Sequence, residues 1–156
     1  MGCLVMTFSE APWSVRFGAM GDAAEAKFLE ACDGKAERFG LNRPEGVHVP
    51  LLPSRMRGAP DFVTNKGLVE CKGLGRAQYL QIKLETHGVM HYWRGLMPLW
   101  IFVWDSHKKR KCMISLEALD ALLNTPDLIN IGYFDDSKLV FRIPADAVFE
   151  AADGEA

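Results

Sequence analysis

Residues 59–73 read APDFVTNKGLVECKG. Two short apolar runs, 62–64 and 68–72, flank the sequence TNKG, and this pattern predicts a β-hairpin. Apolar strands usually bury their side chains, yet these runs carry an aspartate, a glutamate and a lysine in or beside them. The position of these three charges bears on both the fold and the function.

The alternation of side chains along a strand brings two carboxylates together. With a two-residue turn, Asp61 lies directly opposite Glu70, and Lys72 follows two residues later on the same face. Unbridged like charges at opposing positions are unfavourable by roughly 0.2–1 kcal/mol. A hard cation such as Mg²⁺ binds carboxylate oxygens and would remove this repulsion. Two alternatives stay open: a longer loop, which would put Asp61 opposite Cys71, and an ordinary polar surface hairpin.

The composition fits one domain with a sizeable core. The chain has 156 residues, of which 49% are hydrophobic and 24% charged. No apolar run reaches the roughly 20 residues of a membrane span, and no basic segment precedes the short apolar run at the N-terminus. We therefore expect a cytoplasmic protein without membrane contact. The four cysteines form no CxxC pair, so we expect buried free thiols.

Charge is distributed unevenly along the chain, although the net charge is only −2. Residues 35–111 contain fourteen basic and six acidic side chains, whereas residues 112–156 contain two basic and nine acidic ones. A basic middle segment that includes the hairpin indicates a face that binds a polyanion, and the alternative is a solvated surface.

The remaining pattern predicts an α/β fold with a mixed central β-sheet flanked by helices. Before the hairpin we expect a helix over 21–39 and a strand over 47–52, and after it a helix over 77–94 and a strand over 99–104. The later elements expected are a strand over 112–114, a helix over 116–123 begun by Ser115, a hairpin of 130–134 with 139–143, and a frayed tail over 151–156.

The hairpin motif resembles a known nuclease signature. Pro60-Asp61, an eight-residue gap and then Glu70-Cys71-Lys72 resemble the PD-(D/E)xK nuclease superfamily. The resemblance covers about residues 20–104 and implies a restriction-endonuclease-like core of order α-β-β-β-α-β. We therefore expect a single nuclease domain over 1–156, with its core at about 20–115 and residues 116–150 as an elaboration.

The resemblance implies hydrolysis of a phosphodiester that depends on Mg²⁺, for which Mn²⁺ can substitute. Asp61 and Glu70 would bind the metal, with the Cys71 carbonyl as a further oxygen ligand. Glu25, in the first predicted helix, would bind it directly or through water. Lys72 would orient the nucleophile or stabilise charge on the phosphate.

Glu25 also has an interpretation that needs no metal. It shares one helical face with apolar side chains, and a carboxylate on such a face needs a partner. Alternatively, Asp22 and Glu25 form a capping box at the start of the helix. The apolar positions of that face are Phe28, Leu29, Cys32 and Ala36.

The expected partner is DNA. Because the nuclease core fills most of the chain, we expect recognition of DNA shape, as by Holliday-junction resolvases and related branched-DNA endonucleases, and a homodimer. The alternatives are a restriction-type or end-processing nuclease and a catalytically silent binding module. Candidate DNA contacts are Arg55, Arg57, Lys66, Arg76, Gln81, Lys83, Lys108, Lys109, Arg110 and Lys111. His87 and His91 are spaced i, i+4, but without an HExxH pattern they favour a structural or DNA-contact role over zinc.

Overall fold

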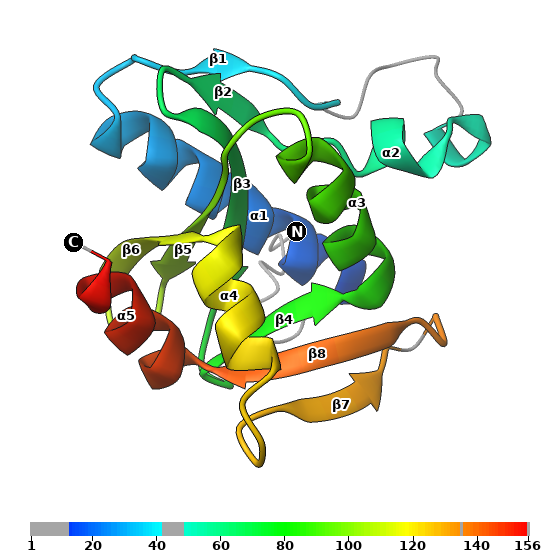
Figure 1. Cartoon of the computed structure of the whole chain (residues 1–156), viewed down its shortest axis with the longest axis vertical. Helices are drawn as coiled ribbons and strands as arrows, with labels where there is room; N and C mark the ends of the chain where they lie inside the picture. Colours follow the sequence, from blue (N-terminus) through cyan, green and yellow to red (C-terminus); the bar gives the residue numbers. More distant parts are fainter. Residues whose placement is uncertain (1–12, 42–48, 135, 156) are drawn as a thin grey trace, which may run out of the picture.

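A five-stranded mixed sheet forms the centre of the computed structural model, which describes residues 13–41, 49–134 and 136–155 (Figure 1). The strands lie in the order β1-β2-β3-β5-β6. Their bounds are β1 Glu37–Arg38, β2 Phe62–Thr64, β3 Gly67–Leu74, β5 Leu99–Asp105 and β6 Arg110–Ser115. The predicted α/β class with a mixed central sheet is confirmed.

One pair of neighbouring strands in this sheet is parallel, and the other pairs are antiparallel. Strands β1, β2 and β3 form an antiparallel meander, β3 runs parallel to β5, and β5 runs antiparallel to β6. A parallel neighbour requires a crossover connection, which the chain makes between Leu74 and Leu99. Strand β5 is the apolar run LWIFVWD, and its central position between β3 and β6 explains why it is apolar on both faces.

The β2–β3 hairpin has the predicted register. Thr64 pairs with Gly67, Val63 with Leu68, and Phe62 with Val69, so the turn comprises residues 65–66. Gly67 has φ 127°, a conformation that strains residues with a Cβ. A Cβ there would also lie 2.3 Å from the Pro98 carbonyl oxygen, so only glycine fits without rearrangement.

A second, three-stranded antiparallel sheet lies beside the first (Figure 1). It comprises β4 Tyr79–Lys83, β8 Leu139–Pro144 and β7 Asn130–Tyr133, in the order β4-β8-β7. The predicted hairpin of β7 and β8 is thus confirmed, and its partner is a strand from the middle of the chain.

Helices cover both faces of the five-stranded sheet (Figure 1). On one face α1 (Trp13–Ala31) packs through Ala24 and Phe28 against Val69, Cys71 and Phe102. On the other face, α3 (Leu84–Arg94), α4 (Leu116–Leu123) and α5 (Ala145–Gly154) share a larger core with Leu68, Ile101 and Val103. Ser115 caps α4 as predicted, because its hydroxyl accepts a hydrogen bond from the Ala118 N–H.

The predicted helix over 21–39 is wrong at both ends. Helix α1 begins at Trp13 and ends at Ala31, after which Asp33 and Gly34 have positive φ and break it. Because Asp22 therefore lies in the interior of the helix, the capping-box interpretation is also wrong.

Three further element predictions are wrong. The strand predicted over 47–52 is a 3₁₀ turn at Val49–Leu51, next to the short helix α2 (Ser54–Arg57), and residues 47–48 lie outside the described part. The helix predicted over 77–94 starts only at Leu84, because β4 pairs with β8 and its alternating Leu80 and Ile82 are buried. The tail predicted to fray over 151–156 is helical through residue 154, as the end of α5, and its Ala152 is buried, while residue 156 lies outside the described part.

The prediction of free thiols is confirmed for the three described cysteines, but that of burial only for Cys71. Cys32, Cys71 and Cys112 are free thiols, with Cys71 buried and the other two half-buried, while Cys3 lies outside the described residues. Within the described ranges, no helix combines the length and apolarity needed to cross a bilayer.

Candidate functional site

The three charged residues of the hairpin motif lie together. Asp61 immediately precedes β2, and its Oδ2 accepts a hydrogen bond of 2.7 Å from the Cys71 N–H. Lys72 donates to Glu70 Oε1 at 2.6 Å. Glu70 and Lys72 share a face of β3, opposite to the face on which Val69 and Cys71 contact α1. The hairpin thus assembles two carboxylates and an ammonium group.

Arg38 connects this group to Glu25. Its guanidinium donates to Glu25 Oε2 at 2.5 Å and lies 4.0 Å from Asp61 Oδ1, while it stacks over Phe62 at 4.3 Å. The sequence prediction missed Arg38 because it placed residue 38 in a helix. The signal that could have revealed it is Asp33-Gly34, a pair typical of a helix end, which leaves residues 37–38 free to form a strand.

Burial and like charge destabilise the ionised form of Asp61. Burial is the largest cause, the Glu70 carboxylate adds to it, and together they raise the pKa of Asp61 to about 7, although the Cys71 N–H opposes them. Burial also disfavours the charged form of Lys72, but Glu70 outweighs that effect and raises the lysine's pKa. Lys72 therefore stays an ammonium at neutral pH.

The charges and donor atoms suit a hard divalent cation. Glu25, Asp61 and Glu70 are three carboxylates facing two cations, Arg38 and Lys72, so one negative charge stays uncompensated when all are ionised. Carboxylate oxygens are the ligands that Mg²⁺ prefers. Asp61 and Glu70 would hold such an ion.

The Glu25 carboxylate does not join Asp61 and Glu70 in a three-ligand cluster. In the described part of the chain, only one set of three His, Cys, Asp or Glu side chains has its ligand atoms within 4.8 Å of one another. That set is His87, His91 and Asp120, and it does not include Glu25. Glu25 instead faces Arg38. The Cys71 backbone contributes its N–H to Asp61, and its role as a carbonyl ligand stays a prediction.

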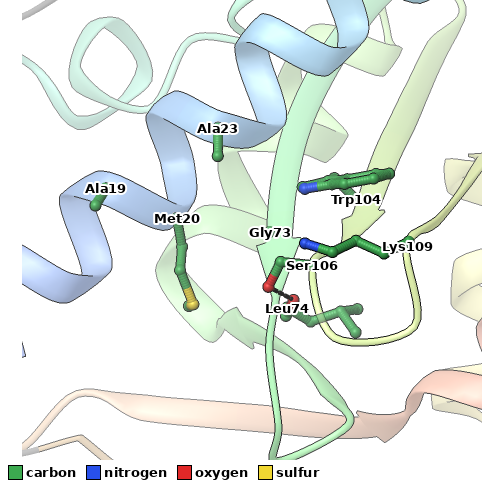
Figure 2. Close-up of a pocket in the computed structure, with 8 residues that line it drawn as sticks. All are labelled: Ala19, Met20, Ala23, Gly73, Leu74, Trp104, Ser106 and Lys109. Carbon is green, nitrogen blue, oxygen red and sulfur yellow. Dashed lines mark hydrogen bonds between the residues drawn. The ribbon is translucent and has the colours of Figure 1, made fainter. Parts of the chain in front are cut away.

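A pocket of about 260 Å³ lies on the α1 side of the sheet, at the C-terminal ends of β3 and β5 (Figure 2). Figure 2 shows the Trp104 ring and the Lys109 side chain extending toward β3, with Met20 on the facing helix. The Ser106 hydroxyl donates to the Leu74 carbonyl at 3.1 Å along its wall. Gly73 lines the pocket, whereas the neighbouring Lys72 points to the opposite face, so the pocket and the hairpin charges are separate features.

Three of the predicted DNA contacts form ion pairs within the protein. Gln81 and Lys83 lie on β4, and not on a helix after the motif, and Lys83 is paired with Asp136 at 3.2 Å. In the basic turn, Lys108 and Arg110 both bind Asp146 of α5, at 3.1 and 2.6 Å. The candidates that are exposed and make no ion pair within the described residues are Arg55, Arg57, Lys66, Arg76, Lys109 and Lys111.

The two histidines of α3 have a partner that the sequence did not indicate. Asp120, on α4, lies 2.7 Å from His87 Nε2 and 2.9 Å from His91 Nε2. It is 29 residues from His91 along the chain, so only the packing of α3 against α4 could reveal it.

The comparisons with known proteins give no assignment. No protein-family model matches the chain, and no curated protein matches it significantly. The interpretation of the site therefore depends on its own chemistry.

Proposed function

We propose that this protein is a metal-dependent DNA endonuclease that hydrolyses phosphodiester bonds, with branched DNA as its substrate. The observation that carries the proposal is the grouping of Asp61, Glu70 and Lys72 at one hairpin. Phosphodiester hydrolysis requires a divalent cation and a positive group near the scissile phosphate. Two adjacent carboxylates and a charged lysine are the side chains that meet these requirements.

The fold supports the resemblance to the PD-(D/E)xK superfamily. Helix α1, the meander β1–β2–β3, helix α3 and the strand β5 parallel to β3 follow one another in the order α-β-β-β-α-β. Asp61 precedes the second strand of the meander, and Glu70 and Lys72 lie on the third. The chain departs from this order in adding the short helix α2 before β2 and the strand β4, which belongs to the second sheet, before α3.

Each charged residue has a role in this proposal. When bound, Mg²⁺ would supply polarisation of the phosphodiester and neutralisation of its charge. Asp61 and Glu70 would hold the ion. Lys72 would donate a hydrogen bond to the attacking water or to a phosphate oxygen. Arg38 keeps Glu25 and Asp61 in place from the neighbouring strand.

The elements formed by the described residues favour recognition of DNA shape over reading of a base sequence. Their elements pack into the two sheets and the covering helices, and none forms a separate module for reading base sequence. Contacts to phosphates alone position a protein on DNA without selecting a sequence. We therefore expect branched DNA to be preferred to linear duplex with the same arms.

The test is cleavage of a panel of labelled linear, flapped, forked and four-way DNAs, with and without Mg²⁺. We expect cleavage that requires Mg²⁺ and is fastest on a branched substrate. Asp61→Asn and Lys72→Ala should each reduce the cleavage rate by about 100-fold or more, because they remove groups that act on the scissile phosphate. DNA binding, measured by fluorescence anisotropy, should change little.

Two matched variants serve as controls. Lys35→Ala and Asp153→Asn remove the same kinds of charge at exposed positions and should leave cleavage unchanged. If Asp61→Asn and Lys72→Ala reduce binding and cleavage equally, the motif is structural. If the wild-type protein binds DNA but cuts nothing with Mg²⁺ or Mn²⁺, the protein is a binding module. Cleavage at one base sequence in linear DNA would indicate a restriction-type enzyme.

A further inference from the structure

The facing surfaces of α3 and α4 carry three side chains that can bind a metal. His87 and His91 are one helical turn apart on α3, with ring centroids 4.7 Å from each other. Asp120 faces them from α4. The two imidazole nitrogens and a carboxylate oxygen all lie within 4.8 Å of one another.

Each histidine contacts a different oxygen of the Asp120 carboxylate. His87 Nε2 lies 2.7 Å from Asp120 Oδ1, and His91 Nε2 lies 2.9 Å from Oδ2 of the same carboxylate. The Phe141 ring packs edge-on to His87, with the ring centroids 6.0 Å apart. Two Nε2 atoms from one helix thus converge on one carboxylate from another, and an ion could replace the protons that they now share with it.

We propose that His87, His91 and Asp120 bind one transition-metal ion of the Zn²⁺ class. Imidazole is a good ligand for Zn²⁺, Co²⁺ and Ni²⁺, whereas Mg²⁺ and Ca²⁺ prefer oxygen ligands. A helical i, i+4 pair of histidines presents two nitrogens to one ion, and the carboxylate supplies the third ligand. The side chain of His91 is 49% exposed, so the fourth position of a tetrahedral site is open to water.

The surrounding charges permit a cation at this position. One turn further along the same two helices, Arg94 of α3 is paired with Glu117 of α4, so its charge is compensated. Glu85, at the other end of α3, is paired with Lys138. The negative charge of Asp120 is therefore available to the ion.

The ion would join α3 to α4, which both cover the same face of the central sheet. Its ligands include none of the residues of the Asp61–Glu70 pair, and the two sites prefer different classes of metal. Binding at the α3–α4 site is thus separable from the proposed nuclease activity, and its role is to stabilise the packing of the two helices.

The experiment uses the full chain after removal of metals with a chelator. Co²⁺ is added as a spectroscopic probe, and Zn²⁺ is then titrated against a chromophoric chelator and in thermal unfolding. We expect one equivalent of Co²⁺ with the absorption of a tetrahedral nitrogen–oxygen site, its displacement by Zn²⁺, and a rise in melting temperature with Zn²⁺. His87→Ala, His91→Ala and Asp120→Asn should each weaken Zn²⁺ binding by about 10-fold or more.

The controls separate this site from others. His107→Ala removes an exposed histidine elsewhere, and Glu70→Gln alters the other candidate site, so both should bind Zn²⁺ as the wild type does. Asp120→Asn keeps a hydrogen-bond acceptor for the histidines, which distinguishes loss of a metal ligand from loss of folding. The proposal is overturned if the wild type binds no Co²⁺ or Zn²⁺, or if the three variants bind them unchanged.

Discussion

The Asp61 carboxylate accepts a hydrogen bond from the Cys71 N–H, yet it is buried and lies close to Glu70. Its pKa is about 7 in the folded chain, compared with about 4 for an unperturbed aspartate. Between these two pH values the folded state binds more protons than the unfolded state. The contribution of Asp61 to folding stability therefore falls as the pH rises from about 4 to 7, and is lowest above 7.

We predict that Asp61→Asn stabilises the metal-free protein at pH 8 and has little effect near pH 4. The substitution removes the charge that is unfavourable at high pH, so the gain should be on the order of a few kcal/mol. Urea unfolding at both pH values, with a chelator present, measures it. Asp153→Asn is the control for an exposed aspartate. A loss of stability at pH 8 would mean that the ionised carboxylate anchors the Cys71 backbone.

Gly67 gives a second prediction at the scale of one residue. Gly67→Ala should destabilise the protein by about 2 kcal/mol or more, because φ is positive and a Cβ would meet the Pro98 carbonyl oxygen. Gly88→Ala is the matched comparison. Position 88 lies in α3, and a Cβ added there would meet nothing within 4 Å, so alanine should stabilise by up to about 1 kcal/mol. Denaturant unfolding of both variants measures the contrast, and equal effects would contradict it.

At the scale of elements, α5 illustrates how a C-terminal segment becomes part of the core. Val148 is fully buried beside Leu119 and Ile143, and the Glu155 carboxylate accepts hydrogen bonds from the Ser115 N–H and hydroxyl. Val148→Ala should lower the free energy of unfolding by about 2 kcal/mol, through lost burial and a small cavity. Glu150→Ala, on the exposed side of α5, should change it little, and chemical unfolding compares them. Similar values for both would mean that α5 is not packed in solution.

The sequence predicted those elements whose pattern is local. The hairpin register follows from TNKG and the alternation around it, and β5 from its unbroken apolar run. The start of α4 follows from Ser115. Each of these signals lies within about ten residues of the element that it predicts.

The elements missed depend on distant partners. Residues 79–83 have helical composition, but pairing with β8, some 60 residues later, makes them a strand. The tail was predicted to fray, but α5 packs its apolar side chains against β6 and α4, which are distant in the sequence. The site residues differ in the same way. Asp61, Glu70 and Lys72 lie within one short stretch of sequence and were predicted. The pairing of Arg38 with Glu25, and of Asp120 with the two histidines, arises only through packing and was not predicted.

At the scale of the whole molecule, the acidic C-terminal third neutralises part of the basic middle. Lys83 pairs with Asp136, Arg94 with Glu117, and both Lys108 and Arg110 with Asp146. Hydrogen bonds from Arg110 and Lys108 lower the pKa of Asp146, so it stays ionised at neutral pH. These ion pairs therefore cancel part of the charge segregation that is seen along the sequence.

We predict that Asp146→Asn strengthens DNA binding and makes it more sensitive to salt. Lys108 would lose its ion-pair partner and could contact a phosphate, whereas Arg110 would keep Asp105. The slope of log affinity against log salt concentration should steepen by about one. Fluorescence anisotropy at several salt concentrations measures this slope. The control Glu150→Gln removes an exposed charge from the same helix, and an equal change in both variants would indicate an effect of net charge alone.

The pairing of β4 with β8 also affects how the chain is made. A ribosome releases residues 79–83 before residues 139–144 exist, and at about 5–20 residues per second the wait is roughly 3–12 s. Throughout that time the apolar Leu80 and Ile82 lack their covering strand in the nascent chain. Unpaired strand edges of this kind aggregate and are bound by chaperones. The yield of folded protein should therefore depend on chaperones that act during translation.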